Sequence, residues 1–187
     1  MNERLEKIKE NWNDLSIVHY CHPNCAPFMN ICRLPKEEAF QQAYKMAADN
    51  HGEEAFWRFK DFENYYPRRI RADEYLYSSF IALGGKPKEK HPLFFVLQGS
   101  KFLNNWFGNG SVTKIPLKNI PSEAISFTLG DSSVMMRDYG EATMHTKETL
   151  QSVLGEYSGS VDDFMGEVVD KYKYIEAQLW DDEYCVS

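Results

Sequence analysis

The stretch Leu93-Phe94-Phe95-Val96-Leu97 is an unbroken apolar run with the length of a buried strand. Two later runs, Val112 to Leu117 and Ala124 to Leu129, also have strand composition, and Tyr174 to Trp180 alternates partly, as a last strand would. Ser16 to Tyr20 adds a short strand near the N-terminus. A sheet is therefore predicted as the centre of the fold.

Helices are predicted around these strands, but helices and strands do not alternate as regular crossover units would require. Apolar spacing and end signals place helices over residues 3–13, 35–51, 67–83, 101–107 and 147–157, with another after Ser160. Phe56 to Phe59 is predicted as a short strand or buried turn. The sequence therefore predicts a single α+β domain over residues 1–187, with a central, mostly antiparallel sheet and flanking helices, rather than a doubly wound fold.

Composition supports one well-packed core. Of the 187 residues, 43% are hydrophobic, and 12 Phe, 11 Tyr and 4 Trp supply large side chains for burial. The predicted buried set is Trp12, Phe40, Phe59, Leu76, Phe80, Phe95, Leu97, Ile125, Phe127, Ile175 and Leu179.

The net charge of −7 argues against general binding to nucleic acid or to anionic membranes. The charged N-terminal segment has no apolar region typical of a signal peptide, and no apolar stretch reaches the length of a membrane span. A cytoplasmic location is therefore expected. The four cysteines are interpreted first as thiols or metal ligands because the cytoplasm is reducing.

The segment after the first predicted strand is rich in possible metal ligands. Cys21, His22, Cys25 and Cys32 lie within twelve residues, and zinc favours four such ligands in tetrahedral geometry. Their spacing does not match paired zinc knuckles. The main interpretation is therefore no metal, with buried thiols and ordinary hydrogen-bonded histidines, and these four residues form the fallback zinc site.

A second candidate site is basic and aromatic. Residues 58–90 hold eight basic and five acidic residues, in contrast to the acidic chain as a whole. Arg68, Arg69 and Arg71 lie beside Tyr65 and Tyr66, and guanidinium groups suit phosphate or carboxylate ligands. The alternative is a solvated helix face whose arginines pair with nearby acidic residues.

Two acidic positions are also notable. Glu176 lies in the last predicted strand, so it would have a raised pKa if it faces a cleft and would be an ordinary surface residue if it faces solvent. Asp131 and Ser132 follow another predicted strand, where a turn that caps the strand is favoured over a nucleophile elbow.

Three stretches together are similar to a known group of sequences. They are residues 58–69, residues 83–97 with Gly84-Gly85-Lys86-Pro87 and His91-Pro92, and the ending from Tyr174 to Asp182. The combination resembles an uncharacterised family of small proteins from Bacillus-type bacteria. That resemblance implies no activity.

A second resemblance is to the ADP-ribosyltransferase fold, with a histidine strand first, an aromatic strand in the middle and a glutamate strand last. It implies that His19 contacts the NAD ribose, that Phe94 or Phe95 lines the nicotinamide pocket, and that Glu176 orients the acceptor. The chain departs from that fold by having Phe in place of the central tyrosine and a Cys/Pro segment after the histidine strand.

Two hypotheses about function follow. The first is a binding protein that holds an anionic small molecule or a protein partner through Tyr65, Tyr66, Arg68, Arg69, Arg71, Phe94 and Phe95. The second is a nucleotide-dependent transferase with His19 and Glu176 as catalytic residues in one cleft, and only this alternative implies NAD as a cofactor.

Overall fold

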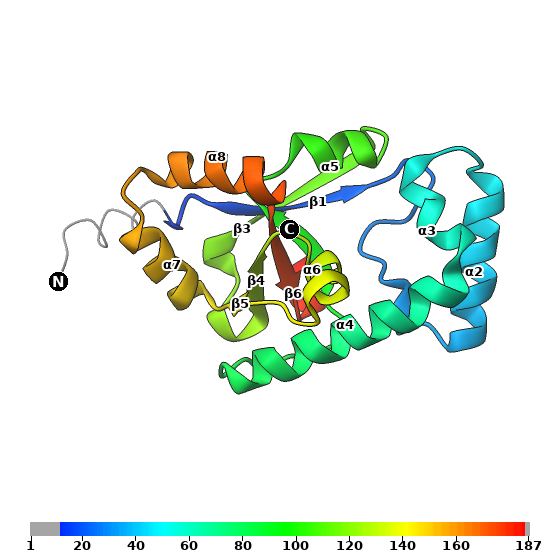
Figure 1. The fold of residues 1–187 in the computed structure, drawn as a ribbon, viewed down its shortest axis with the longest axis horizontal. Coiled ribbons are helices and arrows are strands. Elements are labelled where there is room, and N and C mark those ends of the chain that lie inside the picture. The colour runs from blue at the N-terminus through cyan, green and yellow to red at the C-terminus, as the bar shows by residue number, and fades with distance from the viewer. Residues whose placement is uncertain (1–11, 186–187) are drawn as a thin grey trace.

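A computed structural model describes residues 12–185, apart from the side chains at positions 161, 162, 169 and 170. One six-stranded sheet with the order β3-β1-β2-β6-β4-β5 forms its centre (Figure 1). The strands are β1 (Ser16–Cys21), β2 (Leu93–Leu97), β3 (Ser111–Pro116), β4 (Ile125–Leu129), β5 (Met144–His145) and β6 (Ile175–Leu179). All of the paired neighbours run antiparallel, so the predicted α+β class is confirmed.

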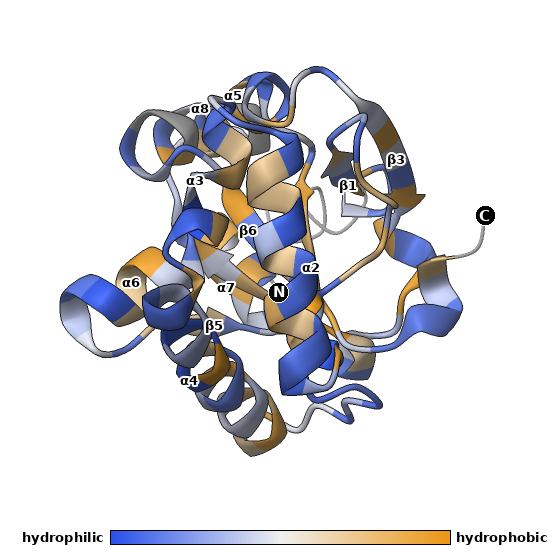
Figure 2. Ribbon diagram, turned by 90° about the vertical axis from the view of Figure 1, so that its right-hand side faces the viewer, coloured by the Kyte–Doolittle hydropathy of each residue, from blue (hydrophilic) through white to orange (hydrophobic). Residues whose placement is uncertain are grey.

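Helices surround the sheet and carry hydrophilic stretches on the outside (Figure 2). They are α2 (Lys36–Asp49), α3 (Trp57–Lys60), α4 (Phe62–Ala82), α5 (Lys101–Trp106), α6 (Ser132–Tyr139), α7 (Lys147–Glu156) and α8 (Val161–Tyr172). Helices α7 and α8 contact β4 and β6, whereas α4 contacts α6 and β5. The central strands are therefore covered by helices.

The main core lies on one face of the sheet. Ile175, Ala177 and Leu179 of β6 point to this face, and they pack with Leu150 and Leu154 of α7. Successive side chains of a strand point to opposite faces, so the even-numbered residues of β6 must point the other way. Burial of apolar side chains from the strands and from α7 and α8 holds this layer together.

The opposite face of β6 carries Glu176 and Gln178, and beyond them Trp180 packs on Leu76 and Phe80 of α4. The Trp180 and Phe80 rings stack with centroids 5.4 Å apart. Glu176 and Gln178 are both buried although they are polar. Buried polar groups require hydrogen-bond partners, so this face must supply them.

Several predicted elements are confirmed. Strand β2 has the predicted bounds, and helix α5 is capped by Ser100, whose hydroxyl accepts a hydrogen bond from the Leu103 N–H. Thr146 caps α7 in a capping box, and Ser160 and Asp163 exchange the hydrogen bonds of the same motif before α8.

Three predictions about local structure are wrong. Residues 54–60 are helical, in a 3-10 turn and α3, rather than a strand or turn. Helix α4 begins at Phe62, not at Pro67, because the fully buried Phe62 ring packs on Phe40 and Phe59 and extends the helix toward its N-terminus. Residues after Asp131 form helix α6, where only a turn was expected.

Ten of the eleven residues predicted to be buried are buried, and Phe40 is only half-buried. The helix predicted over residues 3–13 lies almost entirely outside the described residues. Between residues 12 and 185, none of the helices combines the length and the apolar character needed to cross a membrane.

Candidate functional site

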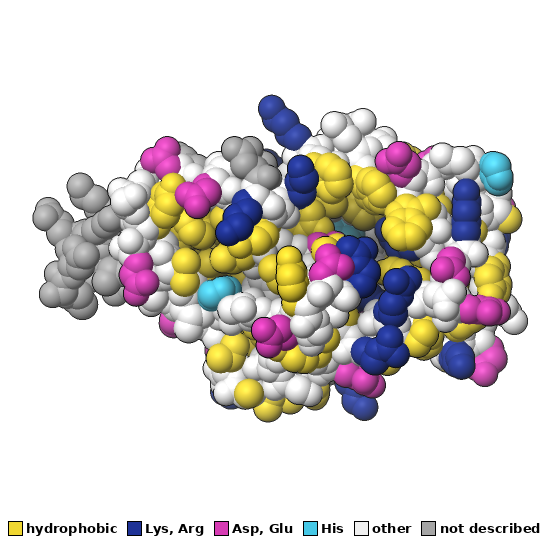
Figure 3. Space-filling model, viewed as in Figure 1, with side chains coloured by type: hydrophobic (Ala, Val, Ile, Leu, Met, Phe, Trp, Pro, Cys, Tyr) yellow, Lys and Arg dark blue, Asp and Glu magenta, His cyan; other side chains and the backbone are white. Residues whose placement is uncertain are grey.

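A large cavity opens between the sheet, helices α3 and α4, and helix α6, with a volume of about 1090 Å³. Of the described residues that line it, seven are Arg or Lys and three are Asp or Glu. Figure 3 shows Lys and Arg side chains together with hydrophobic ones around a hollow in this face. The size corresponds to the upper range of small-molecule sites in proteins.

Glu176 lies at the inner surface of this cavity with 5% of its surface exposed. Its Oε1 accepts a hydrogen bond of 2.5 Å from the Ser132 hydroxyl and one of 2.9 Å from the Gln178 amide. Among the described residues, no hydrogen bond reaches Oε2. The carboxyl group is thus held by one oxygen, and the other has no hydrogen-bond partner in the part of the chain that the structure describes.

Hydrogen bonds that run from Trp180 through Ser126 to Gln178, called the donor chain, fix the orientation of the Gln178 side chain. The Trp180 indole N–H donates to Ser126 Oγ at 2.8 Å, and the Ser126 hydroxyl donates to Gln178 Oε1 at 2.8 Å. Because an indole N–H can only donate, each following bond has a defined direction. The Gln178 amide nitrogen is therefore turned toward Glu176 and toward Thr128 Oγ1, 3.1 Å away.

The strand register explains this arrangement. Ser126 pairs with Gln178 and Thr128 pairs with Glu176 across β4 and β6, so the four side chains share one face of the sheet. Helix α6 then brings Ser132 over Glu176 from the end of β4.

Burial, together with the negative charge of Asp131, raises the pKa of Glu176 from 4.5 to about 7. Arg69 and the hydrogen bonds from Ser132 and Gln178 act in the opposite direction and are weaker. The carboxyl group can therefore both take up and release a proton near neutral pH.

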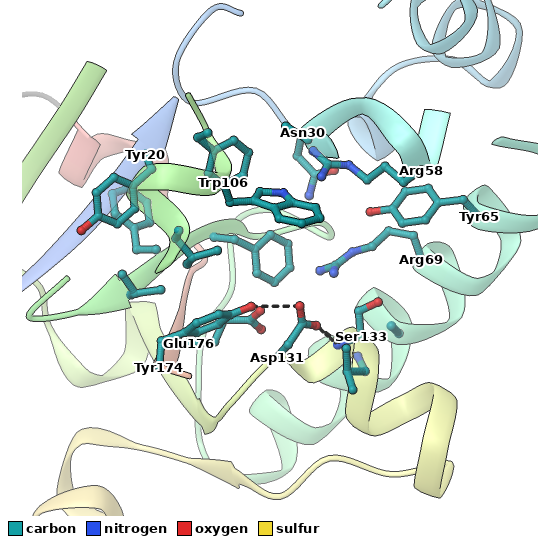
Figure 4. A pocket seen from close by; sticks show the side chains of 18 of the residues that line it. Tyr20, Asn30, Arg58, Tyr65, Arg69, Trp106, Asp131, Ser133, Tyr174 and Glu176 are labelled. Carbon is teal, nitrogen blue, oxygen red and sulfur yellow. Dashed lines mark hydrogen bonds between the residues drawn. The ribbon is translucent and has the colours of Figure 1, made fainter. Parts of the chain in front are cut away.

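Asp131 connects helix α6 to the inner surface of the cavity. Its Oδ1 accepts hydrogen bonds from the backbone N–H groups of Ser133 and Val134, so it caps the helix. Its Oδ2 accepts a 2.9 Å hydrogen bond from the Tyr174 hydroxyl (Figure 4). Burial and the Asp131 charge raise the pKa of Tyr174 far above its usual range, so Tyr174 remains a neutral donor.

Arg69 points from α4 across the cavity toward Asp131 and Glu176 (Figure 4). Its guanidinium lies 3.9 Å above the centre of the Phe94 ring, and its Nη2 is 2.7 Å from Asp73 Oδ1. That ion pair lacks hydrogen-bond geometry, and Nη2 has no hydrogen-bond acceptor among the described residues. Asp73 is fully buried and also contacts His91 Nδ1 at 2.8 Å.

Most of the residues of the predicted basic and aromatic site border this cavity. They are Tyr65, Arg68, Arg69, Arg71, Phe94 and Phe95. Tyr66 instead packs on Phe40 and Phe62, and the Phe95 side chain belongs to the main core. Arg68 and Arg71 are exposed, whereas Arg69 is 9% exposed. The alternative of a solvated helix face is therefore wrong about the exposure of Arg69, although Arg69 does pair with an acidic neighbour, Asp73.

His19 also borders the cavity, but its ring has a structural environment. Its Nδ1 donates to the Phe94 carbonyl at 3.0 Å, and its Nε2 accepts from the Phe28 N–H at 3.3 Å. Burial lowers the pKa of His19, which agrees with this neutral form. The ring packs on Phe95 at 5.2 Å, so it lies on the sheet face opposite to Glu176.

The fallback metal ligands are not gathered around one point. No group of three His, Cys, Asp or Glu side chains within the described part of the chain is arranged to hold a metal ion. Cys21 donates to the carbonyls of His22 and Cys25, and His22 contacts Glu53. Burial raises the pKa of Cys32 to about 12, so its thiol stays protonated.

Several site residues were not predicted from the sequence: Ser126, Tyr174 and Gln178. Ser132 was considered together with Asp131, but both were assigned to a turn. The alternation of polar residues at positions 126 and 128 and at 176 and 178 was the available signal, because two neighbouring strands then present a polar stripe on one face.

Comparisons with protein-family models, with curated proteins and with solved structures give no match for this chain. The resemblances to the Bacillus-type family and to the ADP-ribosyltransferase fold therefore stay predictions. Any function has to be inferred from the site itself.

Proposed function

We propose that the chain binds an anionic organic small molecule in the cavity between α4, α6 and the sheet. The observation that carries this proposal is the contrast in charge. A chain of net charge −7 has seven basic side chains among the described residues that line one hollow, against three acidic ones. Clefts lined by one sign of charge concentrate ligands of the opposite sign.

The walls favour an organic anion over a bare inorganic one. Tyr65, Phe94 and Trp106 line the cavity, and the exposed side chains of Trp57 and Phe102 lie at its border. Flat aromatic side chains bury the apolar part of a ligand and stack on its rings. The guanidinium groups would then hold its phosphate or carboxylate.

The test is a titration of purified protein with phenyl phosphate, benzoate and inorganic phosphate, followed by calorimetry and by thermal unfolding. We expect phenyl phosphate to bind more tightly than inorganic phosphate and to raise the unfolding temperature. Binding should weaken as salt is added, because the charges at the border are exposed. The proposal fails if none of these anions, and no nucleotide, binds.

A second candidate is the nucleotide-dependent transferase, and the observation that favours it is the buried Glu176 carboxyl with its pKa of about 7. His19 gives this candidate no support, because both ring nitrogens are bonded to backbone groups. Turnover of NAD that is unchanged in Glu176→Gln would eliminate it.

A further inference from the structure

Two oppositely charged groups in the cavity have bonding capacity that the described residues leave unused. Arg69 is 9% exposed, and its Nη2 lies 2.7 Å from Asp73 Oδ1 in an ion pair that lacks hydrogen-bond geometry. Glu176 is 5% exposed, and both of the hydrogen bonds it accepts from described residues end on Oε1, so Oε2 is open to a ligand. Polar atoms at a cavity surface with unused bonding capacity mark places where a ligand can complete the bonding.

The two groups are close enough to influence each other, since Arg69 lowers the pKa of Glu176. Figure 4 shows the Arg69 side chain directed across the cavity at the Asp131 and Glu176 side. A ligand that fills this space must therefore offer an acceptor to Arg69 and a donor to Glu176.

The donor chain defines what Glu176 can recognise. Oε1 is committed as an acceptor, because the Gln178 amide nitrogen is turned toward it by Ser126 and Trp180. When the carboxyl group is ionised, Oε2 is also an acceptor only. It would therefore bind an N–H or O–H group of the ligand.

The charged side chains of the cavity differ in how deeply they are buried. Glu176 and Arg69 are buried, whereas Arg68, Arg71 and Arg137 at the border are exposed. Aromatic side chains also line the cavity. A matching ligand has a planar ring with N–H and carbonyl or ring-nitrogen groups at its inner end, and an anionic group at its outer end.

We propose that the ligand is a nucleoside phosphate, with its base against Glu176 and Arg69 and its phosphate on the exposed arginines. This inference rests on the proposed function and specifies the substrate class of the same cavity. Each nucleobase carries both an N–H donor and an acceptor on a flat ring. Phenyl phosphate has a flat ring without this donor and acceptor, and ribose 5-phosphate has hydroxyl groups in place of the base.

The test compares AMP, GMP, CMP and UMP with phenyl phosphate and ribose 5-phosphate by calorimetry. A pH of about 8 keeps most Glu176 groups ionised. We expect at least one nucleotide to bind about tenfold or more tightly than either control ligand, because only a base combines these hydrogen-bonding groups with a flat ring that packs on the aromatic walls. Equal affinities for nucleotides and controls would overturn the inference and leave the proposed function intact, whereas no binding at all would overturn both.

Glu176→Gln supplies the decisive variant. Its amide oxygen would accept from Ser132 and Gln178, so its NH₂ group would replace Oε2 and face the donor of the base. We expect nucleotide affinity to fall about tenfold or more, whereas phenyl phosphate affinity should not fall, because for that ligand the variant only removes a negative charge from the cavity. Glu74→Gln, at an exposed position on α4 outside the cavity, is the matched control. An equal loss for both ligands, or no loss, would contradict the inference.

Discussion

Gln178 donates a 2.9 Å hydrogen bond to Oε1 of Glu176 from two residues along the same face of β6. The direction of this bond is set by Ser126, 52 residues away in the chain from Gln178, because Trp180 donates to Ser126 and Ser126 donates to Gln178. A buried carboxyl group is costly, and its cost falls when donors are arranged around it in advance. The sheet thus holds Glu176 in one orientation toward the cavity.

Glu176→Gln should change how stability depends on pH. The folded pKa of about 7 lies above the ordinary value of 4.5, so the folded chain binds the proton more tightly than the unfolded chain. The wild type therefore loses stability as the pH rises through this window, and the variant has no such titration. The difference in unfolding free energy should grow in favour of Gln by about 3 kcal/mol between about pH 4.5 and pH 8.

Urea unfolding of both proteins across this pH range measures that difference. Asp131 and Arg69 remain in both proteins, so the comparison isolates the loss of the Glu176 titration together with its interactions with these two groups. A difference that stays constant with pH would show that Glu176 has an ordinary pKa in the folded chain.

Asp131→Asn should lower the pKa of Glu176 from about 7 toward 4.5, because the Asp131 charge is the largest contribution after burial. Asn caps a helix as well as Asp does, so α6 should keep its N-terminal cap. A carbon-13 NMR titration of the Glu176 carboxyl measures the shift directly. Asp138→Asn is the control, because Asp138 pairs with Arg137 on the exposed part of α6. An unchanged Glu176 pKa in Asp131→Asn would remove Asp131 from the site.

The strands and most helix ends could be predicted from the sequence because local signals determine them. An apolar run marks β2 and strand-forming residues mark β4, and Ser100 and Thr146 supply the hydroxyl groups that cap α5 and α7. Predictions from local signals were wrong where contacts between segments distant in the sequence determine the structure. Helix α4 passes through Pro67 because Phe62 is buried against rings from α2 and α3, and no rule based on proline position contains that contact.

The candidate site was partly predictable for a similar reason. Composition identified the arginines near Tyr65, and strand alternation allowed two faces for Glu176 without indicating which one a cavity would border. Asp131 was interpreted as a turn residue because Asp favours turns and helix caps equally, and the structure uses it as a cap. The partnership of Ser126 with Gln178 depends on the pairing of β4 with β6, which the sequence does not specify.

Ser126→Ala should destabilise the fold by about 1–3 kcal/mol, because it leaves the Trp180 N–H and the Gln178 carbonyl buried without partners. Urea unfolding near neutral pH measures the loss. Ser133→Ala is a suitable control, because the hydrogen bond that Ser133 makes to Asp131 comes from its backbone N–H. If both variants lose the same stability, the donor chain contributes nothing specific.

Charge removal at the border of the cavity should weaken anion binding without unfolding the chain. Arg68 and Arg71 are exposed residues of α4 that line the cavity, so Arg68→Gln with Arg71→Gln removes two positive charges at low structural cost. We expect the affinity for phenyl phosphate to fall about fivefold to thirtyfold at low salt, since exposed ion pairs contribute up to about 1 kcal/mol each. The difference from the wild type should shrink at high salt, where exposed charges are screened. Lys36→Gln with Lys45→Gln, at two exposed positions of α2 outside the cavity, controls for the same change in net charge. Equal effects of the α2 and α4 substitutions would mean that overall charge, rather than this cavity, attracts the anion.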